Sequence, residues 1–85
     1  MAHQVLESRL GACCHVAEIS SQYLWQGKHE TGQEWALEIR TQLPKLGELE
    51  AWLLAHHPYE VPLVEYWSTT VTPAYGQWLS EVLDG

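Results

Sequence analysis

The amino-acid sequence predicts a single α+β domain that spans residues 1–85. The apolar residues change from helical spacing to a period of two near Ala12, and they return to helical spacing after Pro44. A length of 85 residues suits one domain, and no repeat, low-complexity tract or linker divides the chain. With 46% hydrophobic and 18% charged residues, the composition is that of a globular protein rather than a disordered one.

The first element is predicted to be a short helix over residues 2–10. Val5, Leu6 and Leu10 lie on one face of such a helix. Gly11 follows directly, and glycine commonly ends a helix in the left-handed conformation. We therefore expect the helix to stop at Gly11.

Residues 12–26 and 33–42 are predicted to form a long β-hairpin. One face of the first run is expected to carry every second residue, namely His15, Ala17, Ile19, Ser21, Tyr23 and Trp25. In the second run Trp35, Leu37 and Ile39 alternate with charged residues. Residues 27–32 have a glycine at each end, so the turn is expected there.

A second helix is predicted to begin at Pro44, a residue that the first helical turn accepts. Leu46, Leu49 and Leu53 follow at helical spacing. The helix must end near His57, because Pro58 disfavours a helical conformation in the residue before it.

The last two elements are predicted to be a strand over residues 61–70 and a C-terminal helix. The strand is inferred from the many Val, Tyr, Trp and Thr residues in that segment. Thr72 is a good N-cap and Pro73 a good first residue for the helix. Its apolar face is expected to consist of Tyr75, Trp78, Leu79 and Val82.

The resulting order, α-β-β-α-β-α, is nearly that of a ferredoxin-like subunit with an added C-terminal helix, but the first strand is missing. That strand is central in this fold, so its absence leaves two ladders unpaired. Either the last strand moves over, or another chain fills the gap, or the native chain starts earlier and carries the strand itself.

The charge and the motifs exclude several classes of function. Four Lys and Arg against eleven Asp and Glu give a net charge of −7, which argues against nucleic-acid binding and against docking on an anionic membrane. No apolar run is long enough for a membrane span or a signal peptide, so a cytoplasmic location is expected. Neither a catalytic triad, paired carboxylates, a phosphate-binding glycine loop nor a CxxC motif is present, so the sequence predicts no enzyme.

The aromatic content points to assembly of several copies. The chain has five Trp and four Tyr but no Phe, and Trp and Tyr are favoured at interfaces between subunits. The adjacent Cys13 and Cys14 cannot form a disulfide framework and are expected to be buried, inert thiols. We expect oligomerisation to stabilise this small chain, with the five tryptophans packed in the core and between subunits.

Five short motifs occur in order over nearly the whole chain. They are Arg9-Leu10-Gly11-Ala12-Cys13, Ser21-x-Tyr23-x-Trp25-x-Gly27-Lys28, Leu37-Glu38-Ile39-Arg40-Thr41, His56-His57-Pro58-Tyr59-Glu60-Val61-Pro62 and Ala74-Tyr75-x-x-Trp78-Leu79. Together they resemble the CutA divalent-ion-tolerance family. The sequence departs from the family pattern in the missing first strand and in Arg40, where the family usually has Lys.

The resemblance implies a ferredoxin-like subunit that assembles as a homotrimer and has no established enzymatic reaction. It implies a role in tolerance of copper and other divalent cations, or in metal-responsive binding. The same architecture resembles that of the PII signalling trimers. The alternative function is therefore a PII-like module that binds a small ligand between subunits or docks on a partner protein.

The candidate metal ligands are His56 and His57, which the resemblance places at a copper site. Imidazole nitrogen suits Cu(II) and Zn(II). Neighbours in a helix point about 100° apart, so both rings can reach one ion only where the helix has unwound before Pro58. The other interpretation is structural, because histidines are favoured at a helix C-terminus by the macrodipole. His3, His15 and His29 show no ligand spacing and are expected to be surface or packed residues.

The second candidate cluster would lie in the cleft or interface between subunits. The resemblance places Trp25, Glu34, Arg40, Tyr59 and Glu60 there. Arg40 can bind a carboxylate with two parallel hydrogen bonds, so it either lines a ligand pocket or forms a salt bridge that fixes the trimer register.

Overall fold

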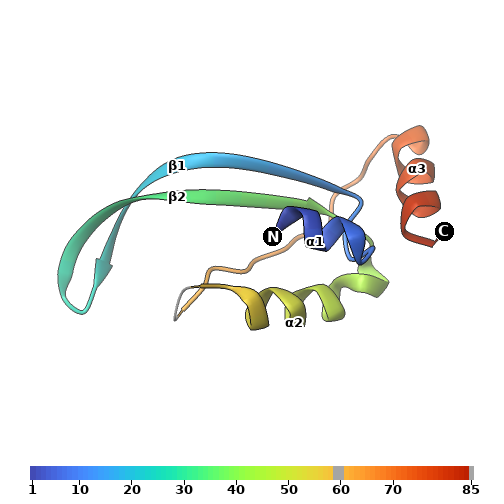
Figure 1. Ribbon diagram of the computed structural model, residues 1–85. Coiled ribbons are helices and arrows are strands. Elements are labelled where there is room, and N and C mark those ends of the chain that lie inside the picture. Colours follow the sequence, from blue (N-terminus) through green and yellow to red (C-terminus); the bar gives the residue numbers. More distant parts are fainter. Residues whose placement is uncertain (59–60, 85) are drawn as a thin grey trace.

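The structure is a computed structural model that describes residues 1–58 and 61–84. Within these residues it contains a two-stranded antiparallel sheet and three α-helices (Figure 1). The hairpin extends well past the helices, so the molecule is elongated, with extents of 46 × 25 × 20 Å. The predicted α+β class with a ferredoxin-like order and a missing first strand is confirmed.

The first helix, α1 (Ala2–Glu7), ends in a Schellman motif. The Arg9 N–H donates to the Leu6 carbonyl at 3.2 Å, and the Leu10 N–H donates to the Val5 carbonyl at 3.1 Å. Arg9 occupies the left-handed position, with φ of 61°. Val5 and Leu10 are both buried, and they form the apolar contact that usually accompanies this motif.

The prediction that Gly11 ends α1 in the left-handed conformation was wrong, because Arg9 does so instead. Gly11 is required for a different reason. A Cβ atom at this position would lie 2.5 Å from Ile39 Cγ2 and 3.0 Å from Val5 Cγ1. The absence of a side chain therefore lets the chain pass between the helix and the sheet.

The hairpin consists of β1 (Cys13–Trp25) and β2 (Lys28–Arg40), paired from Cys13 with Arg40 to Trp25 with Lys28. The predicted long hairpin is confirmed, but the predicted turn over residues 27–32 is wrong. Gln26 and Gly27 have φ of 51° and 77°, so they form a tight two-residue turn of type I′. This turn matches the twist of the strands, so residues 28–32 join the ladder instead of forming a loop.

The second helix follows a single 3-10 turn. This turn spans Leu43–Lys45, and α2 spans Leu46–His56. His57 is extended, with φ of −76° and ψ of 135°, as expected for a residue before proline. The predicted end of the helix is confirmed.

The segment 61–72 has no regular secondary structure, so the predicted strand over 61–70 was wrong. Its composition favours extended backbone, but a strand also needs a neighbour to pair with, and the sheet of the described residues contains only β1 and β2. The last helix, α3, spans Pro73–Asp84. The Gly76 N–H donates to the Thr72 carbonyl at 3.0 Å, which places Thr72 at the predicted N-cap position.

The core is small. Val5, Leu10 and Leu49 form its centre, and Cys14, Ile39, Trp52 and Leu53 are half-buried around it. Leu83 is also buried. Four of the five tryptophans expose more than a third of their surface and Trp52 is half-buried, so they do not form the core as predicted. Their packing between subunits stays a prediction.

Candidate functional site

His56 and His57 lie where α2 ends, one inside the helix and one beyond it. The His56 ring stacks on Trp52, with ring centroids 4.2 Å apart and an interplanar angle of 15°. His57 is half-buried and extended. The unwinding before Pro58 that the sequence analysis required for a shared metal ion is therefore present.

The tautomer of His56 follows from its hydrogen bond. Its Nδ1 lies 2.8 Å from the carbonyl oxygen of Trp52. A carbonyl can only accept, so Nδ1 carries a proton, and in the neutral ring the lone pair is on Nε2. Metal-binding histidines commonly use this arrangement, in which the second ring nitrogen donates to a carbonyl and fixes the ring. The same hydrogen bond also satisfies the structural interpretation, since it caps the helix end.

The structure brings neither cysteine to these histidines. Cys14 packs against the core cluster that contains Leu49, and Leu49 lies two helical turns before His56, about 10 Å along the axis. Cys13 is on the opposite face of the hairpin, since neighbouring strand residues alternate. Among the described residues, no group of three or more His, Cys, Asp or Glu side chains could hold a metal ion.

One pair of potential ligands was not predicted from the sequence. Cys13 Sγ lies 3.8 Å from His15 Nε2. The signal was available, because residues i and i+2 of a strand share a face and Cys-x-His therefore brings a thiol and an imidazole together. The prediction that His15 shows no ligand spacing was therefore wrong.

Cys13 and Cys14 are half-buried, whereas full burial was predicted. The pKa of the Cys14 thiol is raised, mainly because the thiol is partly buried and also because it lies beside Cys13. The pKa of Tyr75 on α3 is raised as well, mainly by partial burial of the phenol and also by its interaction with Cys13. A raised thiol pKa lowers the thiolate fraction at neutral pH, which agrees with the prediction of an unreactive Cys14.

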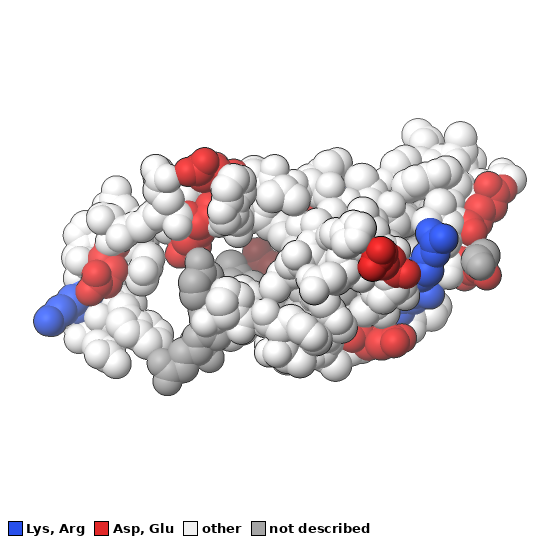
Figure 2. All heavy atoms as spheres, in the orientation of Figure 1, with Lys and Arg blue, Asp and Glu red and all other residues white. Residues whose placement is uncertain are grey.

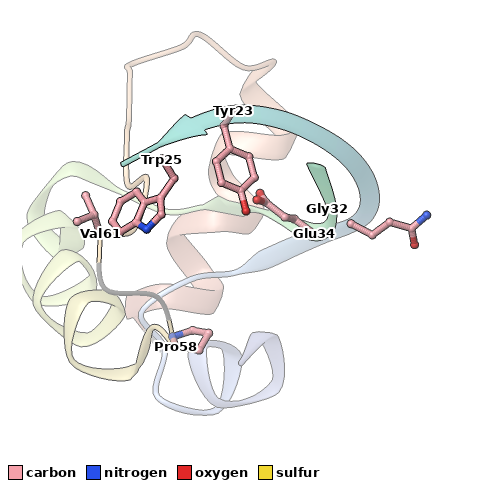
Figure 3. A pocket seen from close by; sticks show the side chains of 7 residues that line it. Tyr23, Trp25, Gly32, Glu34, Pro58 and Val61 are labelled. Carbon is pink, nitrogen blue, oxygen red and sulfur yellow. The ribbon is translucent and has the colours of Figure 1, made fainter. Parts of the chain in front are cut away.

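Two residues of the predicted cleft line one pocket near the tip of the hairpin. Trp25, Glu34 and Tyr23 line it together with Val61, which is drawn beside Trp25, and Pro58 (Figure 3). The pocket has a volume of about 400 Å³. Tyr59 and Glu60, which were also predicted for this cleft, lie outside the described residues.

Arg40 lies at the other end of β2 and lines a second pocket, with Cys13, His15 and Tyr75. It is six residues from Glu34, about 20 Å along the strand, so one chain does not bring the two together. Among the described residues the structure shows an ion pair only between His3 and Glu7. No carboxylate of residues 1–58 or 61–84 forms an ion pair with Arg40 in the single chain.

The surface carries the acidic excess of the sequence. In Figure 2 the Lys and Arg side chains of the visible face lie near its two ends, while acidic side chains are spread between and around them. Of the helices described, each is too short or too polar to span a bilayer.

The fold and the paired histidines define an acidic, ferredoxin-like α+β subunit with a candidate metal site at a helix end. The family model described as CutA1 divalent ion tolerance protein matches residues 1–82. The divalent-cation tolerance protein CutA of Thermococcus kodakarensis is 30% identical over 100% of this chain and 83% of its own length. The chain belongs to the CutA1 divalent ion tolerance protein family.

Solved structures agree with this assignment. CutA from Synechococcus elongatus matches with a TM-score of 0.93 and 31% identity, over 96% of this chain and 74% of that one. The same protein complexed with a Bis-Tris molecule matches with a TM-score of 0.88 and 29% identity, over 96% and 77% of the two chains. The names of the relatives support a role in tolerance of divalent metal ions, and the family is described by that role rather than by a reaction.

Proposed function

We propose that this protein acts in metal tolerance by binding a divalent cation, copper in particular, through His56 and His57. The observation that carries the proposal is the Nδ1 hydrogen bond to Trp52, which leaves Nε2 of His56 ready to coordinate. Ring nitrogen is a good ligand for Cu(II). The sequence contains no enzyme motif, so the proposed role is binding rather than catalysis, and the proposed location is the cytoplasm.

We further propose that the functional unit is a homotrimer. Two histidines from one chain make a weak site, whereas several copies can supply further ligands. The small core supports assembly, because large apolar side chains such as Leu24, Trp35 and Trp67 are more than two-thirds exposed in the single chain. Burial of these side chains between subunits would give the stability that 85 residues alone provide poorly.

A Cu(II) titration by calorimetry at pH 7 tests the metal site. We expect the wild-type protein to bind Cu(II) with micromolar or tighter affinity, and His56→Ala/His57→Ala to weaken binding by at least about tenfold, or about 1.4 kcal/mol. The control is His3→Ala/His29→Ala, which also removes two imidazoles but leaves the end of α2 intact. Equal binding by wild type and the His56/His57 variant would contradict the proposal.

A second candidate function is PII-like binding of a small ligand between subunits. The observation in its favour is the pocket lined by Tyr23, Trp25 and Glu34, since two of these residues were predicted for the cleft from the sequence. The Bis-Tris complex of a similar protein shows that a small molecule binds that relative.

Replacing Arg40 by Ala distinguishes an interface salt bridge from a ligand contact. We expect Arg40→Ala to shift the mass measured by light scattering from the trimer toward smaller species, because a carboxylate on a neighbouring copy would lose the guanidinium that pairs with it. Lys28→Ala, at the tip of the hairpin, is the matched control and should leave the mass unchanged. An intact trimer with altered small-ligand binding would instead assign Arg40 to a pocket.

A further inference from the structure

The start of β1 and the end of β2 bring a thiol, an imidazole and two charged side chains together on one face of the sheet. Cys13 pairs with Arg40 across the ladder, and His15 pairs with Glu38. Residues two apart in a strand share a face, and so do residues that lie directly opposite each other. These four side chains therefore form one group, whereas Cys14 packs against the core on the other face.

The helix α3 approaches this group of side chains. All four line one pocket together with Tyr75, at the end of the hairpin that lies nearest to α3 in Figure 1. Tyr75 forms a side-chain hydrogen bond with Cys13, and a phenol O–H can donate to sulfur. His15 is exposed and Cys13 is half-buried, so an ion from solution can reach both.

The sulfur of Cys13 and the ring nitrogen of His15 are spaced as two ligands of one ion. Cys13 Sγ lies 3.8 Å from His15 Nε2. An ion about 2.3 Å from a sulfur and about 2.1 Å from an imidazole nitrogen holds these atoms about 3.6 Å apart at a tetrahedral angle. The observed distance corresponds to an angle of about 120° at the ion, so the strand need not rearrange to bind one.

We propose that Cys13 and His15 form a second metal site, which binds one Cu(I) ion through Sγ and Nε2. The ion enters as Cu(I), so no electron is transferred. The thiol proton is released to solvent as the bond between sulfur and copper forms. This site is separate from His56 and His57 and does not rest on the function proposed for that pair.

The ligand types and their number favour Cu(I) over a divalent cation. Thiolate is a soft ligand that selects Cu(I) and Zn(II) among the common ions. Cu(I) accepts fewer ligands than Zn(II), whose sites have three or four from the protein. Among residues 1–58 and 61–84, no group of three or more His, Cys, Asp or Glu side chains could hold a metal ion.

The charges around the pair also favour a monovalent ion. With the Cys13 thiolate, the Glu38 carboxylate and the Arg40 guanidinium, the group has one net negative charge. A monovalent cation neutralises this charge, whereas a divalent cation leaves an excess positive charge beside Arg40.

Competition with the coloured Cu(I) chelator bicinchoninate tests the proposal on the whole protein, without oxygen and at pH 7. We expect the wild-type protein to withdraw Cu(I) from the chelator, which lowers the absorbance of the chelate. Cys13→Ser and His15→Ala should each weaken Cu(I) binding by at least about tenfold, because each removes one of the two ligands. Ag(I), which is also soft and monovalent, should compete for the site, and Zn(II) should not.

The matched controls remove the same chemical groups at neighbouring places. Cys14→Ala removes the adjacent thiol, which lies on the core side of the sheet, and His29→Ala removes an imidazole at the other end of the hairpin. Both should bind Cu(I) as tightly as the wild-type protein. His56→Ala/His57→Ala should also keep Cu(I) bound, while Cys13→Ser should keep Cu(II) binding at the end of α2, so the two metal proposals can fail separately.

Alkylation by iodoacetamide, followed by tandem mass spectrometry, tests the site without any substitution. The thiolate is the group that reacts, and a bound ion occupies its lone pair. We expect Cu(I) to slow alkylation of Cys13 in the wild-type protein by at least about tenfold and to leave Cys14 unaffected. This measurement does not depend on whether a variant folds.

Three outcomes would overturn the proposal. The first is that the wild-type protein leaves Cu(I) on the chelator. The second is that Cys14→Ala weakens binding as much as Cys13→Ser, or that His15→Ala has no effect. The third is X-ray absorption by the bound copper that shows two or more sulfur neighbours, which would mean that both thiols or a second copy supply the ligands.

Discussion

Replacing Leu49 by Ala is expected to lower the free energy of unfolding by about 2–5 kcal/mol. Leu49 is 4% exposed and is one of the three residues at the centre of the core, where it joins α2 to α1. With so few buried side chains, the neighbours cannot close the cavity by repacking. A loss of this size approaches the whole stability of a small domain, so the variant should be largely unfolded near 37 °C.

Urea unfolding at one fixed protein concentration measures this effect, because assembly would otherwise change the apparent stability. Leu54→Ala is the matched control, since Leu54 lies on the same helix but is 53% exposed. It should cost less than about 1 kcal/mol. Equal losses in the two variants would show that burial in this core is not what stabilises α2.

The second large effect is expected from Gly11→Ala, a change that adds a single methyl group. The new Cβ would lie 2.5 Å from Ile39 Cγ2, closer than any unstrained contact. Cγ2 of Ile39 is attached directly to Cβ, so it lies close to the backbone of β2 and is not the far end of a flexible side chain. Either β2 or α1 must therefore shift. We expect a loss of about 1–3 kcal/mol, which is typical of overpacking in a core.

Gly32→Ala is the matched control for Gly11→Ala. At Gly32 no heavy atom of the described chain lies within 4 Å of the added Cβ, and the residue is in regular strand. The control should be neutral or slightly stabilising, because alanine reduces the freedom of the unfolded chain. If the two variants unfold at the same urea concentration, the tight passage between Val5 and Ile39 is not a constraint on the fold.

The elements with strong local signals could be predicted from the sequence. The period of two over residues 12–26 and 33–42 gave the hairpin, and Pro58 and Pro73 gave the end of α2 and the start of α3. These signals act on the backbone of the residue itself or of its direct neighbour, so no tertiary information is needed.

The errors in the fold arose where a distant neighbour decides the outcome. Gly11 was expected to be left-handed, but its role is set by Ile39, which is 28 residues away in the sequence. Gly27 and Gly32 both suggested a turn, and only the left-handed conformation of Gln26 shows which one is used. The segment 61–70 has the composition of a strand, but composition cannot supply a partner.

In the candidate site, too, local signals could be predicted from the sequence and contacts between side chains could not. The position of His56 and His57 at the end of α2 followed from Pro58, whereas the tautomer of His56 depends on its contact with Trp52. The separation of Arg40 from Glu34 could have been inferred, because both residues lie in the predicted strand 33–42, six residues apart. The contact between Cys13 and His15 could have been inferred from strand periodicity.

The two-residue turn at Gln26 and Gly27 has a consequence for the order of folding. It brings Trp25 and Lys28 together at almost no cost in loop entropy, and each further pair of the hairpin then adds next to one already formed. Hairpins of this kind close in microseconds. Val5 and Leu49, by contrast, are separated by the whole hairpin sequence, so we expect the core to form after the sheet. The nascent chain therefore presents a finished strand edge before its helices have covered either face.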